Sequence, residues 1–101
     1  VNPITGVSVR VQHERVRTVA GAVRSEQYQQ LIQAMVLLRK ETTLSQAGLA
    51  KILSKPPSFV GKYELGERRL DVVETFVVLK ALGVEPVEFL EIHLRELPGR
   101  L

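Results

Sequence analysis

The chain has 101 residues, of which 45% are apolar and 25% charged, a size and balance typical of one globular domain rather than of a disordered or collagen-like chain. It has no cysteine, its two histidines lie 80 positions apart at His13 and His93, and no apolar run approaches the ~20 residues that cross a bilayer; we therefore expect a soluble, cytoplasmic protein without disulfides, metal or cofactor. The net charge of +3 is unevenly distributed: residues 39–69 contain seven basic and three acidic residues, and residues 70–101 contain three basic and six acidic residues. One face could therefore attract a polyanion. Basic residues that only solvate the helices would give the same counts.

Residues 1–24 form a basic segment, with four arginines against one glutamate. It could be a basic arm, an unstructured leader, an extended segment that pairs across a dimer through Val7 to Val11, or an added helix with Val16, Val19, Ala20 and Val23 on one side. We favour an arm or leader. The predicted domain therefore covers residues 25–101.

The next segment predicts two helices. The first begins near Ser25, a suitable N-cap, and its expected buried stripe is Leu31, Ala34 or Met35, and Leu38, while Arg39 and Lys40 are left for solvent. The second begins at Ser45, with Leu44 and Leu49 as a hydrophobic staple and Leu49, Ala50 and Leu53 facing inward. Pro56 and Pro57 are expected to stop it, because proline disfavours helical geometry in the preceding residue.

Three more helices follow. Pro57 suits the first turn of the third, which has Val60 and Tyr63 inward and ends in a left-handed cap at Gly66. The fourth starts with a capping box of Asp71 and Glu74 and stops at Gly83. The fifth should run from Pro86 to about Leu97, and its wide apolar face predicts either deep burial or a subunit contact.

Several coincident motifs lie in this region, and together they resemble the helix-turn-helix core of the Cro and phage-repressor (XRE) family over about residues 28–93. The matching features are Ser45-Gln46 followed by Leu49-Ala50, Lys62-Tyr63-Glu64 before Gly66, Arg68-Arg69-Leu70-Asp71, and Ala81-Leu82-Gly83-Val84. The resemblance implies an all-α, five-helix, lambda repressor-like bundle whose third helix enters the DNA major groove.

The resemblance assigns Gln46 a phosphate contact and a bracing role toward the third helix. Helical spacing turns Pro57, Ser58, Gly61 and Lys62 outward, because Val60 and Tyr63 face inward. Two positions depart from the family: Pro57 has no donor where relatives often carry a long polar group, and Gly61 has no side chain where serine is usual. Ser58 and Lys62 then either contact base edges or phosphates or are simply solvated. Gly61 would be explained if a backbone approached it closely.

Flanking cations are candidates for phosphate contacts. Arg68 and Arg69, after Gly66, are the first choice, and Lys55 and Arg39 or Lys40 are secondary, with solvated loop residues as the alternative. Phe59 is expected to be partly buried and Tyr63 to lie in the core. We expect Glu64 to pair with Arg68 or Lys40.

These features predict a transcriptional regulator, a repressor above all, that binds double-stranded DNA as a homodimer. The two subunits are expected to contact each other through the fifth helix or the N-terminal segment. The alternative is a protein-interaction module, such as the antitoxin of a toxin pair or a coactivator-like adaptor, which Pro57, Gly61 and the acidic end favour. No paired carboxylates, activated nucleophile or phosphate loop is visible, so an enzyme is not expected.

Overall fold

A computed structural model describes residues 25–100 of the chain. In this range it contains five helices and no strand: α2 (Glu26–Glu41), α3 (Gln46–Ile52), α4 (Ser58–Leu65), α5 (Val72–Ala81) and α6 (Pro86–His93). The predicted all-α class is confirmed. The alternatives for residues 1–24 lie outside the described residues, and none of the helices in 25–100 is long and apolar enough to span a bilayer.

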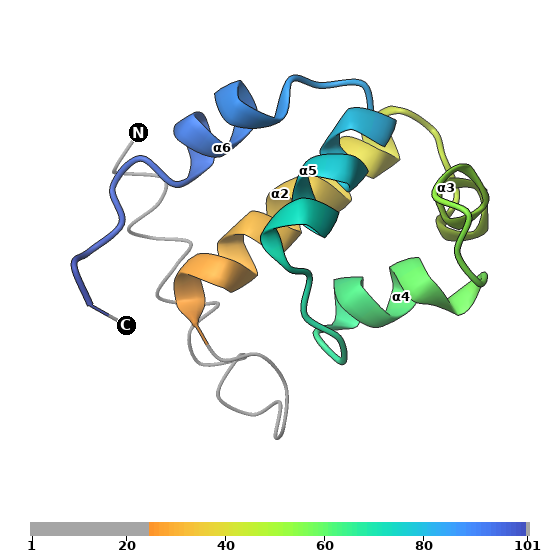
Figure 1. The fold of residues 1–101 in the computed structure, drawn as a ribbon, viewed down its shortest axis with the longest axis horizontal. Helices are drawn as coiled ribbons and strands as arrows, with labels where there is room; N and C mark the ends of the chain where they lie inside the picture. Colours follow the sequence, from red (N-terminus) through yellow and green to blue (C-terminus); the bar gives the residue numbers. More distant parts are fainter. Residues whose placement is uncertain (1–24, 101) are drawn as a thin grey trace.

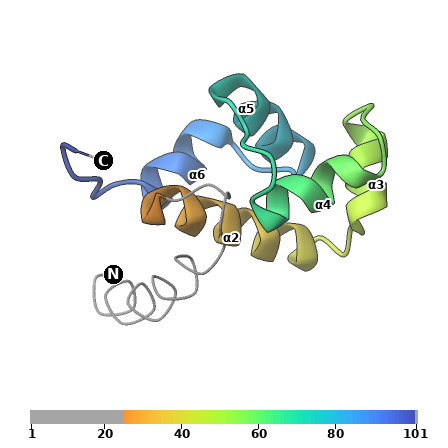
Figure 2. The ribbon, with the colours of Figure 1, turned by 90° about the horizontal axis from the view of Figure 1, so that it is seen from below.

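The longest helix, α2, runs through the middle of the bundle, and α4 and α6 both pack against it. Figure 1 shows α3 and α4 together at one end of the molecule and α6 at the other. In the perpendicular view of Figure 2, α5 and α6 lie on one side of α2, and α3 and α4 are neighbours at the edge of the bundle. The helix-turn-helix pair is therefore peripheral, with α2 behind it.

One apolar core joins all five helices. Its most completely buried large side chains are Ile32, Met35, Leu49, Val60, Tyr63, Val78 and Leu79, which come from α2 to α5, and α6 adds Phe89 and Leu90 at its margin. Burying one such side chain contributes roughly 1.5–3 kcal/mol. Along α2 the buried apolar residues are Leu31, Ile32 and Met35, and Leu38 is partly buried against the core. The predicted stripe of Leu31, Met35 and Leu38 is therefore confirmed, and it missed Ile32.

The helix ends follow the sequence closely. The side chain of Ser25 accepts a hydrogen bond from the Tyr28 amide, and that of Ser45 accepts one from the Gly48 amide. Asp71 and Glu74 make both halves of the predicted capping box. Gly66 closes α4 with φ 86°, in the left-handed region that glycine adopts without steric cost.

The end of α3 is made differently from the prediction. Ser54 adopts φ 58°, and the amides of Ser54 and Lys55 donate to the carbonyls of Lys51 and Ala50, the hydrogen-bond pattern of a Schellman cap. The helix is thus already closed before the prolines. Pro57 is the N-cap of α4 in helical geometry, one residue before the first helical residue, Ser58.

The last helix is shorter than predicted. It begins at Pro86 as expected but ends at His93, and the backbone of Leu94 leaves helical geometry with φ −119° and ψ 22°. Leu94 packs against the core, whereas Leu97 is 50% exposed. The chain therefore stops being helical before Pro98 and Gly99, the residues that the sequence singled out as its end.

Candidate nucleic-acid interface

The outer side of α4 is open to solvent in the part of the chain that the structure describes. Val60 and Tyr63 are buried against the bundle, and Pro57, Ser58 and Lys62 are exposed on the opposite side, with Gly61 half-buried between them. Helical spacing separates these two faces, as the sequence predicted. Figure 1 shows α4 at the rim of the bundle beside α3, and within residues 25–100 this face is left exposed to solvent.

A nearly buried ion pair fixes α4 on α2. The Arg39 guanidinium donates from Nε to Glu64 Oε2 at 2.7 Å and from NH2 to Glu64 Oε1 at 3.1 Å, and it also donates to the Leu44 carbonyl at 2.8 Å. The two side chains are only 9% and 8% exposed. The hydrogen bonds from Arg39 to Glu64 raise the pKa of the guanidinium above its ordinary value, so the arginine stays charged.

This pair corrects two predictions. Arg39 was expected on the solvent side of the first helix and as a secondary phosphate contact, but its guanidinium is buried and satisfied within the protein. Glu64 was expected to pair with Arg68 or Lys40 and instead pairs with Arg39. We therefore remove Arg39 from the residues proposed to touch DNA and treat it as a support of α4.

Gln46 joins α3 to α4 on the open side of the molecule. It is exposed, and its Nε2 donates to Glu64 Oε1 at 2.8 Å, so Arg39, Glu64 and Gln46 form one chain of contacts across α2, α4 and α3. This is the geometry of a brace toward α4. The same amide lies against Gly61, where an added Cβ would be 3.3 Å from Gln46 Oε1. A close neighbour of Gly61 within the protein is thus the Gln46 amide, and a phosphate contact of Gln46 stays a prediction.

The cations after Gly66 and before α4 lie against aromatic rings. The guanidinium of Arg68 is 4.9 Å and the Lys55 ammonium 5.4 Å from the centre of the Phe59 ring, and the guanidinium of Arg69 is 4.8 Å from that of Tyr28. Phe59 itself is 7% exposed, which confirms its predicted burial. Cation–π contacts of exposed groups are worth about 0.5–1 kcal/mol each, so they orient these cations without removing them from the surface.

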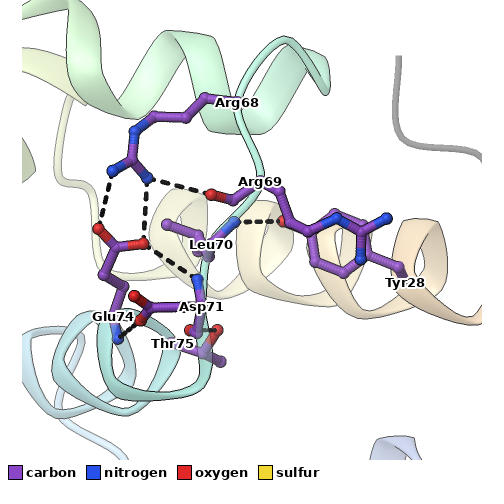
Figure 3. A network of polar contacts seen from close by, with 7 residues as sticks. All are labelled: Tyr28, Arg68, Arg69, Leu70, Asp71, Glu74 and Thr75. Atoms are coloured by element: carbon purple, nitrogen blue, oxygen red, sulfur yellow. Dashed lines mark hydrogen bonds and ion pairs between the residues drawn. The ribbon is translucent and has the colours of Figure 1, made fainter. Parts of the chain in front are cut away.

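Arg68 also forms an ion pair with Glu74 in the first turn of α5. Figure 3 shows its guanidinium on both oxygens of Glu74, at 3.1 and 2.8 Å, while Glu74 accepts from the Asp71 amide at 3.0 Å. The Arg68 hydrogen bonds, followed by the Asp71 amide, lower the pKa of Glu74 to about 2. Arg68 therefore has less freedom to reach a phosphate than Arg69 or Lys62.

Tyr28 is a structural residue that the sequence did not single out. Its hydroxyl accepts a hydrogen bond from the Leu70 amide at 2.9 Å, as drawn in Figure 3, and so ties the loop after α4 to α2. The two residues are 42 positions apart, so no local sequence pattern predicts this contact.

Ser58 and Lys62 are exposed on the outer face of α4, and the Gln46 amide lies next to Gly61 on the same helix. Lys55 and Arg69 are exposed in the segments before and after α4. Amides and hydroxyls bind base edges or phosphates, and lysines bind phosphates or guanine acceptors. Among residues 25–100 no three histidine or acidic side chains gather where they could hold a metal ion.

Comparison with known proteins agrees with this geometry. Residues 37–89 match a family model described as helix-turn-helix. A solved structure of an XRE-family like protein from Pseudomonas syringae pv. tomato str. DC3000 is 35% identical, with a TM-score of 0.67 over 71% of this chain and 88% of that one. No curated protein sequence matches the chain. The chain belongs to the XRE-like helix-turn-helix family of DNA-binding transcription regulators.

Proposed function

We propose that the chain binds specific double-stranded DNA as a homodimer and represses transcription, with the outer face of α4 in the major groove. The observation that carries this proposal is the exposed face of Pro57, Ser58 and Lys62 on a helix whose opposite side is fully buried. The major groove is about 12 Å wide and admits one helix. The brace of Arg39, Glu64 and Gln46 supports the proposal, because groove reading requires a helix that does not shift on its bundle.

Basic side chains lie on α4 and in the chain segments on either side of it, and these are the proposed partners of phosphates. Lys62 lies on α4 itself, Lys55 precedes the helix, and Arg69 follows it in the loop to α5. Such contacts set orientation and affinity without reading sequence. Arg68 is the weaker candidate, because its guanidinium is shared with Glu74.

A second copy of the chain would double the reading surface. The family resemblance and two apolar residues exposed on α6, Val87 at 57% and Ile92 at 60%, support a dimer through this helix, and residues 1–24 are the other candidate contact. Two-fold symmetry would then place half-sites one helical turn, ~34 Å, apart.

Fluorescence anisotropy at ~150 mM salt tests the proposal. A duplex enriched from a random library should bind the full chain at least ~10³-fold more tightly than random duplex. Lys62→Ala should weaken binding and lower the salt slope by about 1, since one phosphate contact is lost. Lys80→Ala, which removes an exposed lysine on α5, is the matched control and should change neither. Equal affinity for enriched and random duplex would refute specific recognition.

A protein-interaction module, such as an antitoxin or adaptor, is the second candidate. It is favoured by apolar residues exposed near the α4–α5 loop: Leu65 at 68%, Val72 at 73% and Val73 at 70%. Large apolar side chains left in solvent are a feature of partner surfaces when they form a patch. Stoichiometric co-purification of one small host protein, together with no preference for any duplex, would select this function over the first.

A further inference from the structure

We propose that Gln46, on α3, reads an adenine in each half-site and takes the place of the side chain that α4 lacks at position 61. The inference rests on the proposed function and deepens it, because it assigns a specificity-determining residue outside the helix that enters the groove. Its basis is the position of the Gln46 amide, which lies on the outer face of α4 rather than at the end of α3 alone.

The amide of Gln46 lies next to the place where a side chain at position 61 would begin. A Cβ built on Gly61 would be 3.3 Å from Oε1, 3.8 Å from Cδ and 3.9 Å from Nε2 of Gln46. Gly61 follows Ser58 by three positions and precedes Lys62, so it belongs to the same outer face. The amide thus stands beside the position that the first atoms of a longer side chain of α4 would occupy.

Hydrogen bonds fix which way the amide points. Its Nε2 donates to Glu64 Oε1 at 2.8 Å, and Glu64 is in turn held by two hydrogen bonds from Arg39. An amide has two N–H donors and one carbonyl acceptor. One N–H is used inward, which leaves one N–H and the Oε1 carbonyl for a ligand, since no other residue in 25–100 is hydrogen-bonded to them.

An adjacent donor and acceptor on one amide match the major-groove edge of adenine. The carbonyl accepts from adenine N6 and the remaining N–H donates to N7, which is the usual bidentate contact of glutamine. Pro57 has no side-chain donor and Ser58 is short, so neither of these positions competes for the adenine edge. A phosphate would use only the N–H and would leave the carbonyl facing negative charge.

Selection from a random duplex library with the full chain and its variants tests the inference. The wild type should prefer adenine at one position of each half-site, and Gln46→Ala should reduce that preference by about 5- to 150-fold, the usual value of one bidentate contact. Gly61→Ala should reduce preference at the same position, because its new Cβ displaces Oε1, and it should fold well, since alanine is the better helix former. Lys62→Ala should leave that position unchanged.

A base analogue gives the sharper readout. Replacing the selected adenine by 7-deazaadenine removes the N7 acceptor, which should weaken the wild type and leave the affinity of Gln46→Ala unchanged. If Gln46→Ala instead weakens binding to all duplexes equally and keeps every base preference, Gln46 contacts phosphate or only braces, and the inference is overturned while the proposed function stands. If the wild type itself enriches no sequence, both fall.

Discussion

Replacing Arg39 by methionine should cost more stability than any other single charge removal that the structure suggests. The change leaves the Glu64 carboxylate, 8% exposed, without its cation, and it deprives the Leu44 carbonyl of its donor. Breaking a buried pair by removing one partner costs about 3–5 kcal/mol, because an uncompensated charge stays desolvated. A small domain has roughly 5–15 kcal/mol in total, so much of its stability would be lost.

Thermal unfolding followed by circular dichroism measures this loss as a fall in Tm, and urea unfolding measures it as a free energy. For a domain of this size each kcal/mol shifts Tm by roughly 4–8 °C, so the melting temperature should fall by at least about 12 °C. Arg68→Met is the matched control: its partner is Glu74, its own side chain is 40% exposed, and removal of such a pair costs about 0–1 kcal/mol.

The double variant Arg39→Met/Glu64→Met separates burial from charge. It removes both ions and replaces them with apolar groups, which is often neutral or stabilising for a buried pair; it should therefore recover most of the stability lost in Arg39→Met. If Arg39→Met costs no more than Arg68→Met, or if the double variant is as unstable as the sum of its single variants, the structural role assigned to this pair is wrong.

Three further predictions concern the helix ends. Asp71→Ala should lower the free energy of unfolding by about 1 kcal/mol, seen by urea unfolding, because the Glu74 amide loses the side-chain cap at 2.7 Å. Gly83→Ala should lower the free energy of unfolding by about 1–2 kcal/mol, because Gly83 has φ 89°, a left-handed conformation that alanine adopts only with strain; no atom lies within 4 Å of the new Cβ, so a clash is not the cause. An unchanged Tm would contradict this prediction. The pKa of Glu74, followed by NMR, should be about 2 rather than 4.5, so its stabilising contribution is present above pH ~4.5 and is lost as pH falls through ~2; an ordinary pKa would contradict the Arg68 contact.

Features set by neighbours in sequence were predictable. The caps at Ser45, Asp71 and Gly66 use side chains or backbone within a few residues of the helix end, and the same residue types recur at such ends because they satisfy free amides and carbonyls. The inward face of α4 followed equally from the spacing of Val60 and Tyr63. These local rules were enough to place the open face of α4.

Contacts between distant segments were not predictable in this way. Arg39 lies 25 positions from Glu64, and an arginine near the end of an amphipathic helix is usually solvated, so its burial has no local signal. The left-handed conformation of Ser54 could not be predicted either, because glycine or asparagine usually occupies this position at a helix end and serine gives no such signal. The closeness of Gln46 to Gly61 depends on both helices being packed, and the sequence could only record that position 61 lacked a side chain.

Backbone amide shifts of the full chain, recorded by NMR with and without an enriched duplex, test the central claim most directly. The account predicts that the largest changes fall on Gln46 and on residues 57–62, with α6 little affected apart from any dimer contact. Largest changes elsewhere, for instance along α5 and α6 with residues 57–62 unmoved, would contradict the assignment of the outer face of α4 as the surface that meets DNA.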